Sequence, residues 1–90
     1  MSNIIIRKEG ENKFEVVVNK DGETRHNVKL DNDYWEKLTG KEIPKKELIR
    51  KSFEFLLARE SNQSILSRFD LNAIGEYFPG YEKEIKSSFD

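Results

Sequence analysis

Residues 48–60 read LIRKSFEFLLARE, and their apolar side chains recur at intervals of three and four. The members of this stripe are Leu48, Ile49, Ser52, Phe53, Leu56 and Leu57, with Phe55 at its margin. Charged residues such as Arg50, Lys51 and Glu54 fall largely on the other side. This spacing predicts an amphipathic helix whose broad apolar face packs against the rest of the chain. The stretch carries too many charges to span a membrane and is too short for a sustained coiled coil.

Two segments near the N-terminus have the composition of β-strands. Residues 4–6 are three isoleucines, which begin a short run that ends at Gly10. In residues 13–19, Phe14, Val16 and Val18 alternate with Glu15 and Val17, a pattern that favours a strand. Asp21 and Gly22 follow as a strong turn signal, because glycine tolerates the positive φ of a two-residue hairpin turn. We therefore expect a hairpin here.

A third strand, over residues 24–30, returns from that turn. Val28, Leu30 and His26 share the face that we expect to be buried. The opposite face carries the polar side chains Arg25, Asn27 and Lys29. We treat this strand as an edge of a small antiparallel meander of two to three strands. Because strand edges pair readily with other chains, we place a homodimer seam or a partner surface there.

A short helix precedes the main one. Asp33 and Glu36 fit a capping box at its start, and Gly40 fits the left-handed position after its end. Its inward side chains are Tyr34, Trp35 and Leu38. Pro44 suits the first turn of the main helix, which makes Ile43 the N-cap, although isoleucine has no side-chain acceptor.

The chain after the main helix is less regular. Residues 61–64 are a polar break, and a short apolar turn follows: Ile65, Leu66 and Phe69. Asp70 is placed to cap a helix over residues 71–78, and Pro79-Gly80 ends it. The side chains expected on one side of that helix are Leu71, Ile74, Tyr77 and Phe78. A last helical turn or two includes Tyr81 and Ile85. We expect the aromatic group Tyr77, Phe78 and Tyr81 to cap the core, or to form a partner surface if it is exposed.

Length and composition predict one α+β domain over residues 1–90, with the β-meander at about 3–30 and the helical part at 32–86. Three to four helices would pack on one face of the sheet.

The chain has no cysteine, which excludes disulfides and cysteine-ligated zinc. Sixteen basic residues face seventeen acidic ones, so net charge does not indicate a nucleic-acid binder. The first ten residues lack the apolar run of a signal peptide. We expect a cytoplasmic protein that does not associate with membranes.

Several sequence strings resemble a family of short, uncharacterised prokaryotic proteins. These strings are HNVKL, YWEKLTG, LIRKSFEFLLARE, ILSRF and IGEYFPGYEKEI, within a match from about Phe14 to Ile85. The family shares a His-x-Val strand, an LTG turn, an SFxFLLxRE helix and a YFPxY segment. Its members tend to have serine where this chain has Ile43. The resemblance implies no activity, because none is assigned to that family.

A second, partial resemblance covers residues 25–60. A strand of alternating polar residues, a helix, a turn ending in glycine and a helix beginning ELIRxS are similar to the ribbon-helix-helix DNA-binding module. That resemblance implies base contacts by Arg25, Asn27 and Lys29, and a phosphate at the amides near Lys45 and Lys46. Both lysines oppose the helix dipole in an unbound protein. The short first helix, the preceding hairpin and the net charge of −1 count against it.

No group of residues has the spacing of a catalytic site. His26 could serve as a general base, but no partner is named by the sequence, so we expect it to be a half-buried strand residue. Ser52 has no nucleophile elbow around it, and we expect its hydroxyl to bind the carbonyl one turn back. The acidic residues of the last third, Asp70, Glu76, Glu82 and Glu84, show no calcium pattern.

We therefore expect a protein that is not an enzyme and that has no cofactor and no metal. Its function would be macromolecular binding or self-association, with an unknown protein partner or a homodimer. A ribbon-helix-helix-like DNA-binding dimer is the alternative. Candidate partner or nucleic-acid surface residues are Arg25, Asn27, Lys29, Lys45 and Lys46.

Overall fold

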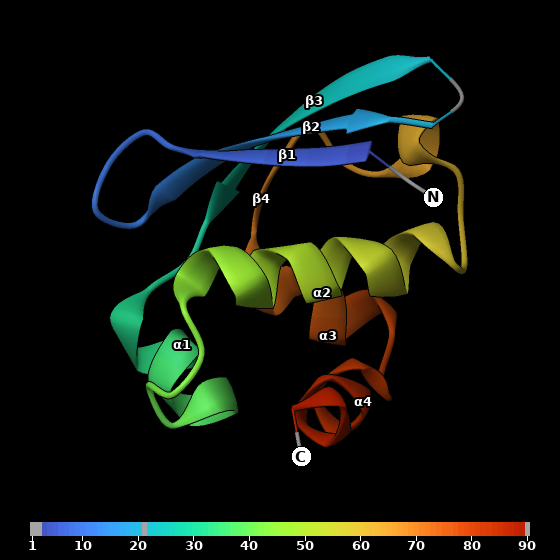
Figure 1. The fold of residues 1–90 in the computed structure, drawn as a ribbon. Coiled ribbons are helices and arrows are strands. Elements are labelled where there is room, and N and C mark those ends of the chain that lie inside the picture. Colours follow the sequence, from blue (N-terminus) through green and yellow to red (C-terminus); the bar gives the residue numbers. More distant parts are fainter. Residues whose placement is uncertain (1–2, 21, 90) are drawn as a thin grey trace.

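The computed structural model describes residues 3–20 and 22–89. Its elements, in chain order, are β1 (Asn3–Lys8), β2 (Lys13–Asn19), β3 (Glu23–Lys29), α1 (Asn32–Thr39), α2 (Lys45–Leu57), the 3₁₀ turn η1 (Asn62–Ser64), β4 (Arg68–Asp70), the 3₁₀ turn η2 (Leu71–Ala73), α3 (Ile74–Tyr77) and α4 (Tyr81–Ser88). This is the predicted α+β class, with the meander first and the helices after it (Figure 1).

Within the described residues the strands form one sheet in the order β1-β2-β3-β4. The first three strands are antiparallel neighbours, as predicted. Strand β4 was not predicted; it pairs parallel with β3, with Val28 opposite Phe69. The predicted turn residue Asp21 lies outside the described residues, whereas Gly22 has the positive φ, +92°, that its turn requires.

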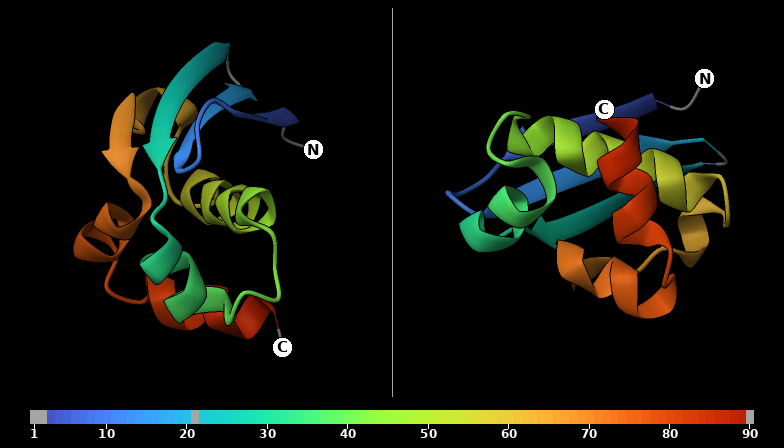
Figure 2. Two further views of the ribbon diagram at one scale, coloured as in Figure 1. Left: turned by 90° about the vertical axis from the view of Figure 1, so that its left-hand side faces the viewer. Right: turned by 90° about the horizontal axis from the view of Figure 1, so that it is seen from below.

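The helices cover one face of the sheet and leave the other face open to solvent (Figure 2). On the covered face the alternating apolar side chains of β1, β2 and β3 are buried, with Val16 and Val18 completely enclosed. The open face carries the other half of each strand, including Ile5, which is 56% exposed. The period of two along each strand thus separates core from surface, as the sequence predicted.

Helix α2 lies against the covered face, and α1 and α4 pack on its far side (Figure 2). Phe53 reaches His26 of β3, with ring centroids 5.4 Å apart. On another side of the helix Phe55 packs edge-on against Tyr81 at 5.2 Å and Phe78 at 5.8 Å. Because both sides of α2 are covered, the apolar stripe is wider than the single stripe of a surface helix.

Local details of the helix ends differ from the predictions. Helix α2 begins at Lys45 and ends at Leu57, and Pro44, not Ile43, is its N-cap. The Pro44 carbonyl accepts hydrogen bonds from the amides of Glu47 and Leu48, so a residue without a side-chain acceptor can hold this position.

The predicted capping box at the start of α1 was wrong, because α1 starts after Asp31 and has no side-chain cap. Gly40 does take the left-handed conformation, φ +64°, and its amide binds the Glu36 carbonyl.

Candidate functional site

Arg25, Asn27 and Lys29 lie along β3 on the open face of the sheet, because they alternate with the buried residues of that strand. Arg25 is held by two carboxylates, Glu23 at 3.3 Å and Glu15 at 3.7 Å. The predicted edge is not free: Asn27 to Lys29 pair with β4, and the Asn27 amide also donates to Ser67. A homodimer seam along the second half of β3 is therefore blocked by the chain itself.

A polar hollow of about 460 Å³ lies at the β4 side of this open face. Its lining residues are Glu9, Lys13, Phe14, Asn27, Val28, Lys29, Arg68, Phe69 and Asp70. Three of these residues are basic and two are acidic, and Lys29 stands between Lys13 and Asp70 in the strand register. Opposite charges in the hollow offset one another, so it is not a strongly basic surface.

Lys45 and Lys46 lie apart from those strand residues, on the first turn of α2 and on the helix side of the sheet. The Lys45 ammonium group is 5.4 Å from the centre of the Trp35 ring. It donates hydrogen bonds to the side chains of Asn12 (3.0 Å) and Asn32 and to the Glu11 carbonyl (3.5 Å). An ammonium group has three donors, so Lys45 would have to give up contacts to bind a phosphate. Lys46 is exposed.

His26 is more deeply buried than the half-buried position we expected, since only 2% of it is exposed. Its Nδ1 is 2.7 Å from the Leu66 carbonyl oxygen, and its Nε2 is 2.9 Å from Thr24 Oγ1. A carbonyl can only accept, so Nδ1 donates to Leu66; in the tautomer with its proton on Nδ1, Nε2 accepts from the Thr24 hydroxyl. Thr24 Oγ1 accepts in turn from Asn62 Nδ2 at 3.0 Å. Both ring nitrogens have a hydrogen-bond partner and the ring is almost fully enclosed, which leaves no place for a substrate.

Ser52 is also enclosed, and its hydroxyl donates to the Leu48 carbonyl at 2.7 Å, as predicted. The hydroxyl has one proton, so the Tyr81 hydroxyl, 2.6 Å away, donates to Ser52 Oγ. Burial raises the pKa of Tyr81 well above its usual value, and the nearby charge of Glu82 adds to that shift. Both hydroxyls therefore hold α2 to α4 and do not form a nucleophilic site.

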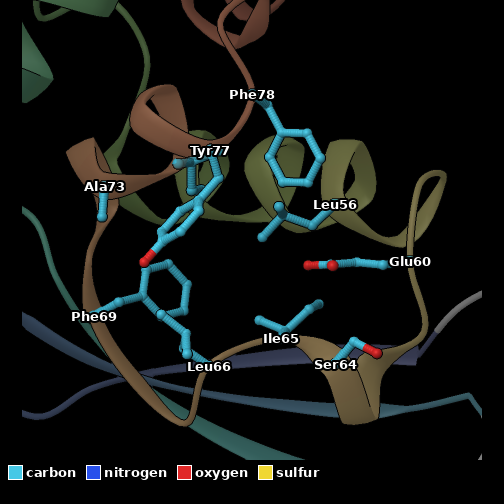
Figure 3. Close-up of a pocket in the computed structure, with 10 residues that line it drawn as sticks. Leu56, Glu60, Ser64, Ile65, Leu66, Phe69, Ala73, Tyr77 and Phe78 are labelled. Atoms are coloured by element: carbon cyan, nitrogen blue, oxygen red, sulfur yellow. The ribbon is translucent and has the colours of Figure 1, made fainter.

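An apolar groove of about 370 Å³ opens between the end of α2 and the segment from η1 to α3 (Figure 3). Its lining residues are Leu56, Glu60, Ser64, Ile65, Leu66, Phe69, Ala73, Ile74, Tyr77 and Phe78. We call this the apolar groove. Its volume is within the range of about 300–1,000 Å³ that is usual for ligand pockets.

The rim of the apolar groove carries large exposed side chains. Leu66 is 52% exposed and Tyr77 is 68% exposed. Figure 3 shows the Tyr77 ring extending toward Phe69, and the Glu60 carboxylate pointing into the space between Leu56 and Ile65. Of the three large apolar residues exposed within the described chain, the third, Ile5, is on the open face of the sheet. Exposed apolar surface of this kind marks interaction sites more often than single scattered residues do.

The sequence did not predict this groove, for two structural reasons. We expected Tyr77 on the inward side of one helix over residues 71–78, but η2 has three residues per turn and changes the phase before α3 begins. We also expected residues 65–69 to be an apolar turn. Instead, the backbone of Ile65 is extended and β4 begins at Arg68, with Ile65 buried and Leu66 exposed.

No group of three or more histidine and acidic side chains within the described residues could hold a metal ion. No helix in residues 3–20 and 22–89 is long and apolar enough to cross a membrane. Comparisons with protein-family models, with curated proteins and with solved structures found no match for this chain. The two resemblances noted in the sequence therefore stay predictions.

Proposed function

We propose that this domain is a non-catalytic protein-binding module, and that the apolar groove receives large apolar side chains of a partner protein. The observation that carries the proposal is the exposure of Leu66 and Tyr77 together at the rim of one groove. Aromatic and aliphatic side chains around a concave site are what interface hot spots use. The core does not require these two side chains, because more than half of each is already in water.

The state of His26 and Ser52 supports a non-catalytic role. His26 is the residue suited to general-base chemistry and Ser52 the one suited to nucleophilic chemistry, and both are almost fully enclosed with their hydrogen bonds satisfied. A general base must come within hydrogen-bond reach of its substrate. Neither residue can do so without opening the core.

The test uses a photo-reactive benzoylphenylalanine placed at Tyr77 in the cell of origin, with the same residue at Ile5 as the control. Ile5 has similar exposure but lies on the other face of the sheet. We expect an adduct with a protein other than a second copy of this chain from position 77 only, insensitive to nuclease. The purified partner must then bind the wild-type chain, and bind Leu66→Ser more weakly. Equal adducts from both positions, or adducts that nuclease removes, would contradict the proposal.

A second candidate function, self-association, is favoured by the outer edge of β1. This strand has no partner on its outer side among the described residues. The side chain that reaches its backbone is Arg50, which donates to the Ile4 carbonyl at 2.9 Å. Antiparallel pairing of two β1 strands about Ile5 would set Ile4 opposite Ile6 of a second copy and Arg7 opposite Asn3. Apolar residues would meet apolar ones, and like charges would stay apart.

The DNA-binding alternative has less support. A ribbon-helix-helix dimer needs its ribbon strand to pair with a second copy, and β3 already lies between β2 and β4. Lys45, implied as a neighbour of the phosphate, is engaged by three oxygen atoms. Binding to DNA that weakens steeply with added salt would revive this alternative.

A further inference from the structure

We propose that the partner segment of the apolar groove is cationic: beside its apolar anchor it carries a lysine or arginine that pairs with Glu60. This inference rests on the proposed function and names the chemistry of the partner. Of the ten residues that line the groove, Glu60 alone is charged. Its carboxylate points into the groove and not away from it (Figure 3).

Within the described residues, no basic side chain forms an ion pair with Glu60. The neighbouring Arg59 is committed elsewhere, since its guanidinium donates to the Phe55 carbonyl at 3.0 Å and to Glu84 at 2.7 Å. Lys20 reaches the end of the same helix, but it donates to the Leu57 carbonyl. The cations near the end of α2 therefore leave the Glu60 carboxylate without a counter-charge.

The position of Glu60 is also unfavourable with respect to α2. Its amide donates to the Leu56 carbonyl at 2.9 Å, so it extends the last turn of that helix. The C-terminal end of a helix carries partial negative charge and favours cations. A carboxylate at this end, half-buried among apolar side chains, is opposed by the dipole and by partial loss of water. A bound lysine or arginine would relieve both effects.

An anionic partner would meet the opposite situation. Its carboxylate or phosphate would enter an apolar space beside Glu60, and like charges in such a place repel strongly. A neutral apolar segment would fill the groove but would leave Glu60 further desolvated and still unpaired. Charge complementarity therefore selects a basic amphipathic segment over the other two.

The experiment measures binding of three N-acetylated, C-amidated peptides to the full chain. They share one anchor that contains Phe and Leu, and they differ only in two flanking residues, which are Lys, Gln or Glu. Amide chemical-shift changes locate the binding, and titration gives the affinity. We expect shifts at Leu66, Ala73 and Tyr77. We also expect the Lys peptide to bind about tenfold more tightly than the Glu peptide, a preference that shrinks at high salt.

Glu60→Gln should abolish the preference for the Lys peptide. The matched control Glu54→Gln makes the same chemical change on an exposed part of α2 outside the groove, and should retain it. If the three peptides bind the groove equally, or if Glu60→Gln keeps the preference, the inference fails while the proposed function stands. If no peptide shifts the groove residues, both fail.

Discussion

The hydrogen-bonded pair Ser52 and Tyr81 allows a quantitative prediction, because the direction of its hydrogen bond is fixed by the Leu48 carbonyl. In Tyr81→Phe, Ser52 loses a donor but still donates to Leu48, so we expect a cost of about 1 kcal/mol. In Ser52→Ala, the Tyr81 hydroxyl stays buried without an acceptor, which costs about 2 kcal/mol. The single substitutions should thus be unequal, although they break the same bond.

The double variant Ser52→Ala, Tyr81→Phe removes the unpaired hydroxyl. It should therefore be only about 1–2 kcal/mol less stable than the wild type, below the sum of the single changes. Urea unfolding followed by circular dichroism gives the free energies, and an unchanged m-value confirms that stability alone has changed. If Ser52→Ala is as mild as Tyr81→Phe and the two costs add, then Tyr81 does not donate to Ser52, contrary to this prediction.

Three further predictions concern pH, the strand edge and the histidine. Burial raises the pKa of Tyr34 and of Tyr81 above the ordinary value of 10.0. As the pH rises, these tyrosines therefore ionise in the unfolded chain before they ionise in the folded chain, so the free energy of unfolding should be retained below pH 10 and should decrease above it. Tyrosinate absorbance and circular dichroism should then change together. Ile5→Lys should leave the free energy of unfolding within about 0.5 kcal/mol of the wild type, and should remove any dimer seen by sedimentation equilibrium. Thr24→Val should cost about 2 kcal/mol in urea unfolding, because it removes the donor to His26.

The parts of the fold that follow a regular repeat could be predicted from the sequence. The period of two in residues 13–19 and the spacing of three and four in residues 48–57 each place one face in the core, and the structure has both elements. Their faces are set by burial of many side chains at once. The apolar pattern therefore still predicts the buried face of the helix although Ser52 is polar, because the Ser52 hydroxyl donates a hydrogen bond within its own helix.

The helix starts were harder to predict, because each depends on one or two hydrogen bonds. Asp33 and Glu36 have the spacing of a capping box, but the carbonyl of Asp31 accepts the Trp35 amide at 3.0 Å, which starts α1 two residues earlier. Tertiary contacts favour that start: Trp35 donates to the Ile43 carbonyl, and Tyr34 donates to Glu82. A local motif was thus overridden by contacts with residues outside the helix.

Strand β4 accounts for two structural features that the sequence did not predict, the paired edge of β3 and the apolar groove. It has three residues and no visible alternation, so nothing in the sequence separates it from a turn. By pairing with Asn27 to Lys29 it covers the edge where we expected a partner. The segment that leads into β4 leaves Leu66 exposed, and Phe69 of β4 lines the groove together with Leu56. The segment that closes the predicted interface therefore builds the apolar groove. Both features depend on the parallel pairing of β3 with β4, which joins residues about 40 positions apart. A reading of local sequence patterns does not detect such a non-local contact.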